Sequence, residues 1–329
     1  MGAKVLVTGG TGITGGYLSR YLAEHGYTVR ALDCKSSWIV DDLRKLGVEV
    51  VLGDVTDPDS VREAVKGVEV VYHLAAIYNQ ENVTNRQFWE ANALGVKNML
   101  EASLQADVVR FVHCSTVGVH GHVAHPPADE NAPFNYTHVY TGTKLDGEKI
   151  ARDFYTDHGL PISIVRPAGV YGPGDFRFLK LYRAIKNGWF VMLGNGKTLY
   201  HLVYLEDLAR GFELCGTKPE ALGQTYIIAD NEYLTLERYV ATIAEVLGAP
   251  TPRWHFPIWP VYAAGILCET VCKPLGIEPP LYRRRVDFFR QDRAFNISKA
   301  KRELGFCPKV DTRTGIKLTA DWYQEKGYL

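Results

Sequence analysis

A tyrosine and a lysine four residues apart, Tyr140 and Lys144, are the side chains whose types and spacing best suit chemistry. Residues at i and i+4 of a helix share one face, so the two groups would lie side by side. Tyrosine titrates at a pH of about 10 and is a poor base at neutral pH. A neighbouring ammonium, or a cationic ring bound nearby, favours the phenolate and lowers the pKa. The pair therefore predicts a group that exchanges a proton with an alcohol oxygen.

A second pair with the same spacing, Tyr182 and Lys186, has to be weighed against the first. Position distinguishes them. Tyr140 opens the predicted helix that follows the fifth predicted strand, whereas Tyr182 comes after the sixth, beyond the border of a second lobe. We interpret Tyr182 as part of a core or surface helix and assign the chemistry to Tyr140.

A hydroxyl at the end of the fifth predicted strand, that of Thr116, completes a candidate catalytic set with Tyr140 and Lys144. It could hydrogen-bond a substrate oxygen and stabilise the charge that develops there. The alternative is a local role, in which the hydroxyl caps backbone groups at the strand end.

A glycine-rich segment, residues 8–15 (Thr-Gly-Gly-Thr-Gly-Ile-Thr-Gly), lies between the first predicted strand and the first predicted helix. A helix N-terminus offers unpaired N–H groups and a positive dipole end, which favour a pyrophosphate. Glycines permit the tight turn, the close approach of phosphate to backbone and the packing of helix on strand. The segment predicts a dinucleotide site whose candidate contacts are Gly9, Thr11, Gly12, Ile13 and Gly15.

The carboxylate of Asp33 ends the second predicted strand, about 20 residues after the glycines, where it can accept hydrogen bonds from both adenine ribose hydroxyls. It would repel the additional phosphate of NADP, although Lys35 nearby could soften that repulsion. The alternative is an exposed turn residue at the strand end. Asp33 favours NAD over NADP as the cofactor.

Two more segments follow the third and fourth predicted strands, where ligands bind in open α/β sheets. The aspartate of the first could accept from the adenine amino group, and the small side chains of the second would let backbone pass close to the cofactor. The candidate cofactor contacts in these segments are Asp54, Val55, Leu74, Ala75 and Ala76.

The elements that position these residues alternate between short β-branched runs and amphipathic stretches, a pattern typical of βαβ units. Strands are predicted at 4–7, 28–32, 49–52, 68–73, 110–114 and 162–166, and helices at 15–25, 60–65, 88–105 and 140–158. After Pro173 turn signals multiply, and helical segments dominate from Leu234 onward. The expected fold is α/β, a Rossmann-type doubly wound parallel sheet over residues 1–174 with a smaller, mostly helical substrate lobe over 175–329, interleaved as one compact unit.

Composition excludes several classes of function. The 329 residues carry 37 basic and 37 acidic side chains, so no excess of positive charge exists to bind nucleic acid. The longest strongly apolar stretch, 256–268, contains two prolines and is too short for a bilayer span of about 20 residues. The N-terminus lacks the pattern of a secretory signal. Six cysteines then indicate reduced thiols and a cytoplasmic protein.

No metal site is expected. His120, His122 and His125 lie close together in the sequence, but no acidic or cysteine partner at ligand spacing accompanies them. Cys268 and Cys272 are interpreted as two small core residues on a helix.

Together these motifs resemble the extended short-chain dehydrogenase/reductase family, over nearly the whole chain. The resemblance also covers the segments 166–175 (Arg-Pro-Ala-Gly-Val-Tyr-Gly-Pro-Gly-Asp), 203–209 and 297–306. It implies strand order 3-2-1-4-5-6, bound NAD, a Ser/Thr–Tyr–Lys triad, a small-molecule substrate and frequently a homodimer. It also places Pro167 and Val170 beside the cofactor.

Subclasses of this family differ at a few positions. Nucleotide-sugar dehydratases and decarboxylases carry acidic residues just after the triad Ser/Thr, where this chain has Val117 and Gly118. Nucleotide-sugar 4-epimerases usually have Asn where Gly169 stands and Arg where Tyr200 stands. Phosphate contacts could come instead from the basic cluster Arg283, Arg284 and Arg285, with Arg290 and Arg293, whose alternative is a solvated basic face.

The segment 166–175 and the aromatic-rich apolar segment 254–268 are most similar to the 3β-hydroxysteroid dehydrogenase-like branch. We therefore expect an NAD-dependent oxidoreductase acting on a secondary alcohol or ketone of a non-nucleotide ring compound. The alternatives are a 4-epimerase with tightly bound NAD, resembling UDP-glucose 4-epimerase, and a non-catalytic NAD-sensing scaffold. The presence of Thr116, Tyr140 and Lys144 disfavours the scaffold.

Overall fold

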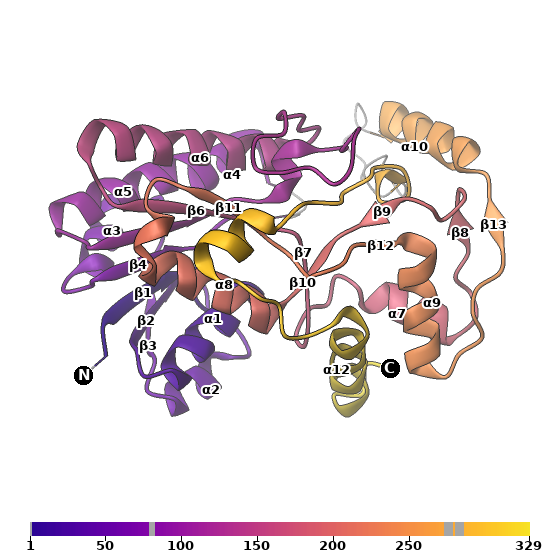
Figure 1. Ribbon diagram of the computed structural model, residues 1–329, viewed down its shortest axis with the longest axis horizontal. Helices are drawn as coiled ribbons and strands as arrows, with labels where there is room; N and C mark the ends of the chain where they lie inside the picture. Colours follow the sequence, from indigo (N-terminus) through magenta and orange to yellow (C-terminus); the bar gives the residue numbers. More distant parts are fainter. Residues whose placement is uncertain (1, 79–82, 273–278, 280–285) are drawn as a thin grey trace.

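The structure is a computed structural model that describes residues 2–78, 83–272, 279 and 286–329. At its centre is a seven-stranded parallel sheet in the order β11-β6-β5-β4-β1-β2-β3 (Figure 1). The predicted doubly wound α/β fold and its order 3-2-1-4-5-6 are confirmed. The strands are β1 (Lys4–Thr8), β2 (Thr28–Asp33), β3 (Glu49–Leu52), β4 (Val70–His73), β5 (Arg110–Cys114), β6 (Ile162–Pro167) and β11 (Thr225–Ile228).

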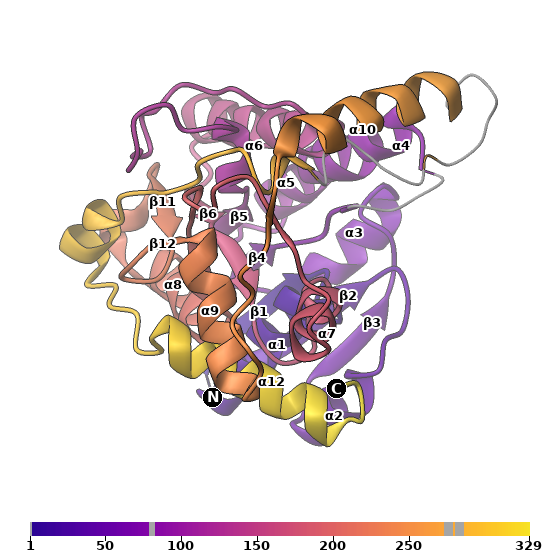
Figure 2. The same cartoon turned by 90° about the vertical axis from the view of Figure 1, so that its right-hand side faces the viewer.

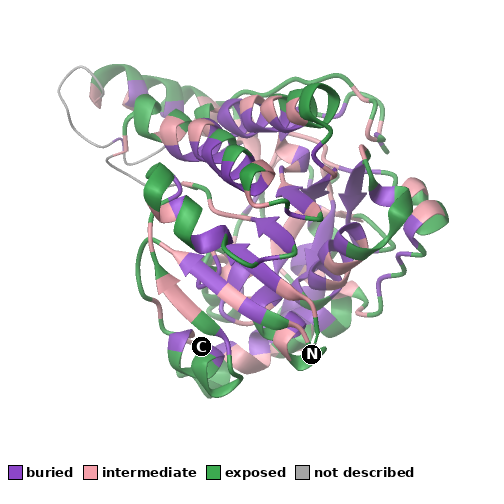
Figure 3. Ribbon diagram, turned by 90° about the vertical axis from the view of Figure 1, so that its left-hand side faces the viewer, coloured by how far each residue is buried: buried purple, intermediate pink, exposed green. Residues whose placement is uncertain are grey.

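The strands form because their sequences are nearly continuous apolar runs, which burial on both faces of a parallel sheet requires. Every residue of β4, β6 and β11 is buried, whereas the edge strand β3 is only partly so (Figure 3). Strand β11, which was not predicted from the sequence, pairs with β6 and forms one edge of the sheet.

Helices cover both faces of the sheet (Figures 1 and 2). One core joins the sheet to α3 (Pro58–Val65), α5 (Gly95–Gln105) and α6 (Val139–His158). A second joins it to α1 (Ile13–Glu24) and α8 (Leu205–Thr217), and the short α2 (Val40–Lys45) follows β2.

The helix predicted over 88–105 starts three residues earlier and changes its winding along its length. It consists of α4 (Asn85–Trp89), a π-helical turn η1 (Glu90–Leu94) and α5. The helices predicted at 15–25, 60–65 and 140–158 are present as α1, α3 and α6, with ends shifted by at most two residues.

A second packed region lies at the opposite end of the molecule from α3 and α5 (Figure 1). Its core is rich in tyrosine and forms between α7 (Leu179–Lys186), α9 (Leu236–Leu247) and α12 (Thr312–Glu325). Three small sheets brace it: β7 (Gly169–Tyr171) with β10 (Leu202–Tyr204), β9 (Leu199–Tyr200) with β12 (Leu234–Thr235), and β8 (Met192–Leu193) with β13 (His255–Phe256).

The two regions share the chain beyond residue 174, because α8 and β11 return to the layers of the main sheet. The apolar helix α10 (Ile258–Cys272) lies at the outer edge of the molecule (Figures 1 and 2). No helix within the described residues combines the length and the apolar character that a bilayer crossing demands.

Candidate active site

Helix α6 presents Tyr140, Lys144 and Glu148 at successive i+4 positions, so the three side chains follow one stripe. The side chain of Lys144 is buried, and its Nζ makes no hydrogen bond to any described residue. A buried ammonium without a partner is costly, and burial accordingly lowers the pKa of Lys144, while Cys114 and Glu148 act to raise it. Such an orphaned donor fits a site that a ligand completes.

The phenol of Tyr140 packs edge-on against the ring of Tyr78, with 4.8 Å between ring centroids. Burial raises the pKa of Tyr140, Cys114 and Tyr78 act in the same direction, and Arg177 acts in the opposite direction. This differs from the expectation that Lys144 lowers the pKa. In the protein alone desolvation dominates, which favours the protonated phenol.

The hydroxyl of Thr116 accepts a hydrogen bond from the backbone N–H of Gly118, 3.1 Å away, and so caps the turn η2 (Val117–His120). The local capping role is therefore present. It uses the oxygen as an acceptor and leaves the O–H able to donate to a substrate oxygen. A Cβ on Gly118 would lie 2.8 Å from Thr141 Cγ2, so the turn packs directly on the first turn of α6.

The glycine-rich segment forms a cradle in which Gly9 and Gly15 leave no room for a side chain. Gly9 has φ +64°, and a Cβ there would lie 3.0 Å from the backbone of Ala75. A Cβ on Gly15 would lie 2.1 Å from the carbonyl oxygen of Gly9. Gly12 begins α1 without a side-chain cap, which leaves the first N–H groups of α1 available to an anion. These residues, with Ile13 in the first turn, fit the pyrophosphate of a dinucleotide.

The carboxylate of Asp33 is held at the end of β2 by Thr11. Asp33 Oδ2 accepts from the Thr11 backbone N–H at 3.1 Å and from the Thr11 hydroxyl at 2.9 Å. No other described residue hydrogen-bonds to this carboxylate, so Oδ1 remains able to accept from ribose hydroxyls. Thr11 therefore joins the glycine cradle to Asp33, which fits the adenosine end of a dinucleotide.

The segments after β3 and β4 also lie where a cofactor would pass. Asp54 Oδ1 accepts from the N–H and hydroxyl of Thr56, and the buried Val55 packs against Gly95 of α5. Thr8 holds the second segment, because its backbone oxygen accepts from Leu74 N and its hydroxyl from Ala75 N. Ala76 continues this segment and is exposed.

Pro167 ends β6, and Val170 lies in β7 just beyond it. The backbone oxygen of Val170 accepts from Arg177 Nη2 at 2.9 Å. Asp175 binds the same guanidinium with both carboxylate oxygens, at 2.8 and 2.7 Å. The segment that leads from β6 toward the second packed region is thereby fixed near Tyr140.

Asn92 is a site residue that sequence analysis missed. It is fully buried in the π-helical turn η1, accepts from Ile77 N at 2.7 Å and donates to Thr143 Oγ1 at 3.1 Å. It thus links the segment after β4 to the helix that carries Tyr140 and Lys144. A polar residue within an otherwise apolar helical stripe was the signal available in the sequence.

A buried ion pair, also missed, lies one helical turn beyond Lys144. Arg166 and Glu148 are both buried, and Arg166 Nε donates to Glu148 Oε2 at 3.0 Å. Arg166 Nη1 lies 3.0 Å from His120 Nε2. Burial, with help from this guanidinium, lowers the pKa of His120, so the neutral ring accepts the hydrogen bond.

The remaining residues considered from the sequence have structural contacts. Tyr182 is buried in α7 and packs edge-on against Tyr323, as expected of a core residue. His122 Nδ1 accepts from Asp292 N. The six cysteines are unpaired. The cluster Arg283–Arg285 lies outside the described residues.

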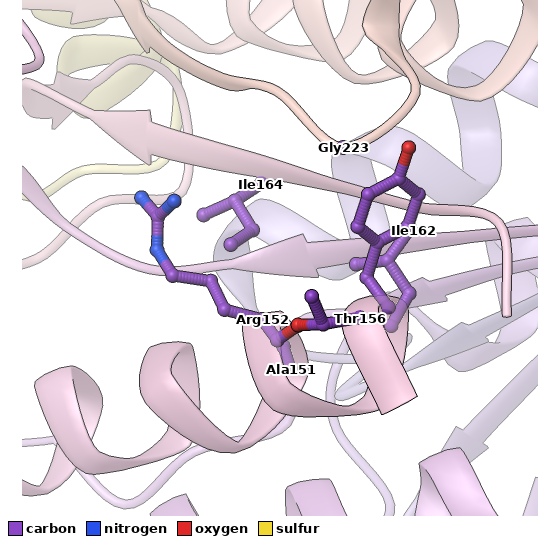
Figure 4. A pocket seen from close by; sticks show the side chains of 7 residues that line it. Ala151, Arg152, Thr156, Ile162, Ile164 and Gly223 are labelled. Atoms are coloured by element: carbon purple, nitrogen blue, oxygen red, sulfur yellow. The ribbon is translucent and has the colours of Figure 1, made fainter. Parts of the chain in front are cut away.

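Two cavities lie away from Tyr140. One, of about 540 Å³, reaches Thr11, Gly12 and Ile13 from the side of α2 and α12. The other is smaller and is formed by the second half of α6 with β6 and Gly223, and Arg152 extends beside it (Figure 4). No candidate site residue lines the second cavity.

The NAD dependent epimerase/dehydratase family matches residues 5–229 of this sequence. The chain belongs to this family. The match confirms the resemblance to extended short-chain dehydrogenases/reductases and makes the protein an enzyme of an NAD-dependent class. The glycine cradle, Asp33 and all of the parallel sheet except Lys4 lie within the matched range.

Curated relatives bear out the similarity to the 3β-hydroxysteroid dehydrogenase-like branch. The 3-beta-hydroxysteroid dehydrogenase of Mycolicibacterium neoaurum is 29% identical over 342 residues, which cover 98% of this chain and 92% of the relative. The 3beta-hydroxysteroid-dehydrogenase/decarboxylase isoform 2 of Arabidopsis thaliana is 27% identical over 96% of this chain, which spans 61% of that protein. A crystal structure of gox2253 is similar over the whole of both chains, with a TM-score of 0.84 and 26% identity.

Proposed function

We propose that this protein is an NAD-dependent dehydrogenase or reductase that acts on a secondary alcohol or ketone of a non-nucleotide ring compound. The observation that carries the proposal is the buried, unpartnered Nζ of Lys144 one helical turn from Tyr140. When bound, the nicotinamide dinucleotide supplies the hydride acceptor or donor. The chain's own residues then have to hold the substrate oxygen and move its proton.

Tyr140 is the proposed group that takes or returns the proton of the alcohol. Burial keeps its phenol protonated in the free protein, which suits the reductive direction, in which the phenol donates to the developing alkoxide. In the oxidative direction, Lys144 and the cationic nicotinamide would favour the phenolate. Thr116 would donate to the same substrate oxygen and stabilise its developing charge.

Asp33 supports NAD rather than NADP as the cofactor. Because Thr11 already holds Oδ2, a second anion at the ribose would meet a fixed carboxylate. Purified protein should therefore turn over with NAD⁺ at much higher kcat/KM than with NADP⁺. Equal values would contradict this assignment.

The experiment that tests the proposal is incubation with NAD⁺ and a panel of cyclic secondary alcohols, monitored by the absorbance of reduced cofactor. Net reduction of NAD⁺ by at least one alcohol supports a dehydrogenase. The proposal would be contradicted if no alcohol of the panel reduced NAD⁺ and none of the matching ketones oxidised NADH.

A nucleotide-sugar 4-epimerase is the second candidate, favoured by the family match. Against it, residue 169 is glycine, and a Cβ there would lie 3.1 Å from the Tyr200 hydroxyl, so an asparagine at 169 would crowd this hydroxyl. Retention of NAD through purification together with thermal stabilisation by UDP would favour the epimerase. No shift with any nucleoside diphosphate would eliminate it.

Two further expectations join this proposal. A homodimer, with α5 and α6 contributing a helical face, should be visible as a doubled mass in light scattering. A cytoplasmic location is supported by six cysteines that form no disulfide.

A further inference from the structure

Two arginines act on the tyrosines around the proposed catalytic phenol. Arg177 acts on Tyr140 and Tyr200, and Arg293 acts on Tyr200. The two arginines differ in how their charge is neutralised. Arg177 lies over the ring of Tyr78, 5.7 Å from its centroid, and Tyr78 in turn packs on Tyr140. Asp175 binds Arg177 with both oxygens, so this arginine contributes little net charge. The second arginine, Arg293, has no such partner in the part of the chain that the structure describes.

Arg293 is placed by a β-bridge to Tyr200, in which Arg293 N donates to Leu199 O at 2.9 Å. Paired residues in a bridge project to the same face, so the guanidinium accompanies the Tyr200 phenol. Burial raises the pKa of Tyr200, and the guanidiniums of Arg293 and Arg177 act in the opposite direction. Both charges therefore act on the same hydroxyl, which lies over Gly169.

The charge of Arg293 is uncompensated within the described residues. Its Nη2 donates to the neutral amide of Gln291 at 2.8 Å, and no carboxylate in that part of the chain forms an ion pair with it. The adjacent Asp292 accepts instead from Leu199 N at 2.7 Å. Arg293 is half-buried. Some of its N–H donors therefore stay accessible to a ligand, and the guanidinium is only partly hydrated.

Arg177 connects Tyr78 with Tyr200, because its guanidinium lies over the Tyr78 ring and acts on the Tyr200 hydroxyl. Tyr78 is 43% exposed, and both phenols act on one another electrostatically. A guanidinium flanked by hydroxyl donors matches the planar oxygens of a carboxylate, which arginine can bind through two parallel hydrogen bonds. The pyrophosphate of a dinucleotide has its own site at the start of α1 and does not need Arg293.

We propose that the substrate of this enzyme carries a carboxylate close to its carbinol carbon, and that Arg293 binds this carboxylate, with the hydroxyls of Tyr78 and Tyr200 beside it. The inference rests on the proposed dehydrogenase function and names its substrate class, a hydroxy acid or keto acid built on an apolar ring. Arg293 thereby sets which side of the substrate faces Tyr140.

Turnover tests the specificity directly. The probes are 2-hydroxycyclohexanecarboxylate, its methyl ester and cyclohexanol, each with NAD⁺. We expect kcat/KM to be at least tenfold higher for the acid than for the ester. In Arg293→Gln the preference should disappear through KM, with kcat on the ester unchanged, and Arg293→Lys should restore part of it. Arg313→Gln, which removes an exposed arginine paired with Glu245, is the matched control and should keep the full preference.

Binding without turnover separates the two proposals. Cyclohexanecarboxylate has no hydroxyl to oxidise, so calorimetric titration into the NADH-loaded protein reports the carboxylate contact alone. Wild type and Arg313→Gln should bind it at least tenfold more tightly than Arg293→Gln does, and more tightly than the carboxamide or cyclohexyl phosphate. Equal binding by wild type and Arg293→Gln, or stronger binding of the phosphate, overturns the inference. If the carboxylate contact fails but neutral alcohols are turned over, the dehydrogenase proposal still holds. If the carboxylate binds through Arg293 but no alcohol is turned over, only the dehydrogenase proposal is contradicted.

Discussion

The side-chain amide of Asn92 forms two hydrogen bonds with the backbone of Ile77. It accepts from the N–H at 2.7 Å and donates to the carbonyl oxygen at 3.1 Å. Tyr78, which packs on Tyr140, is the next residue. The π-helical turn that carries Asn92 therefore fixes the backbone next to Tyr78, whose ring packs on the proposed catalytic phenol. π-helical turns inside helices are frequent at functional sites.

Replacing Asn92 by alanine should harm both folding and catalysis. The change leaves the Ile77 backbone groups and Thr143 without their buried partner, which costs about 1–3 kcal/mol for each group left unsatisfied. Urea denaturation should show the loss of stability, and kcat should fall because Tyr78 and Tyr140 lose their support. Wild-type kcat in a folded Asn92→Ala variant would contradict the positioning role.

The glycine cradle predicts a selective loss of cofactor binding. In Gly15→Ala the new methyl group meets the carbonyl oxygen of Gly9, so the loop must move away from the start of α1. We expect the Kd for NADH, measured by fluorescence titration, to rise at least tenfold. Gly47→Ala is the control, because Gly47 also has positive φ (+80°) but nothing lies within 4 Å of an added Cβ. That variant should lose about 1 kcal/mol of stability and no cofactor affinity. Unchanged NADH affinity in Gly15→Ala would argue against the cradle.

Breaking the buried pair Glu148–Arg166 should destabilise the fold strongly. Glu148→Gln leaves the guanidinium buried without a counter-charge, which costs about 3–5 kcal/mol in buried pairs of this kind. The double variant Glu148→Gln with Arg166→Met removes both charges and should recover part of that loss in a denaturant titration. A single variant as stable as wild type would show that water already compensates the pair.

Asp230 should make stability depend on pH. Burial raises the pKa of Asp230 to about 7, against an ordinary value of 3.8. The folded state therefore holds a proton that the unfolded state has lost between these values. Stability from this group is complete below pH 3.8 and is lost as pH rises toward 7, by up to about 4 kcal/mol. Asp230→Asn should remove this slope, so the difference in free energy of unfolding between wild type and variant should change between pH 4 and pH 8. A constant difference would contradict the raised pKa.

Much of the fold could be predicted because its strands are buried on both faces and are therefore continuous apolar runs. β11 escaped prediction since its four residues follow a long excursion through the second region, and nothing local in them indicates pairing with β6. The π-helical turn escaped because one extra residue in a helical turn leaves the apolar pattern of 88–105 nearly unchanged.

The candidate site was predictable where chemistry dictates residue type, as in the glycine cradle, Asp33 and the Tyr140–Lys144 pair. The residues that hold this site in place could not be predicted from the sequence. Glu148 and Arg166 are 18 residues apart, and charged residues are seldom buried, so sequence gives no reason to pair them. The raised pKa of Tyr140 also required the structure, because desolvation depends on packing from distant segments.

The most direct test of the catalytic role of Tyr140 removes one tyrosine hydroxyl at a time from the two Tyr-x-x-x-Lys pairs. With a competent alcohol and saturating NAD⁺, Tyr140→Phe should lower kcat roughly 10²- to 10⁴-fold while NADH still binds. Tyr182→Phe, which removes a buried hydroxyl that has no hydrogen-bond partner among the described residues, should keep wild-type kcat. Full turnover by Tyr140→Phe would contradict the central claim that this phenol moves the substrate proton.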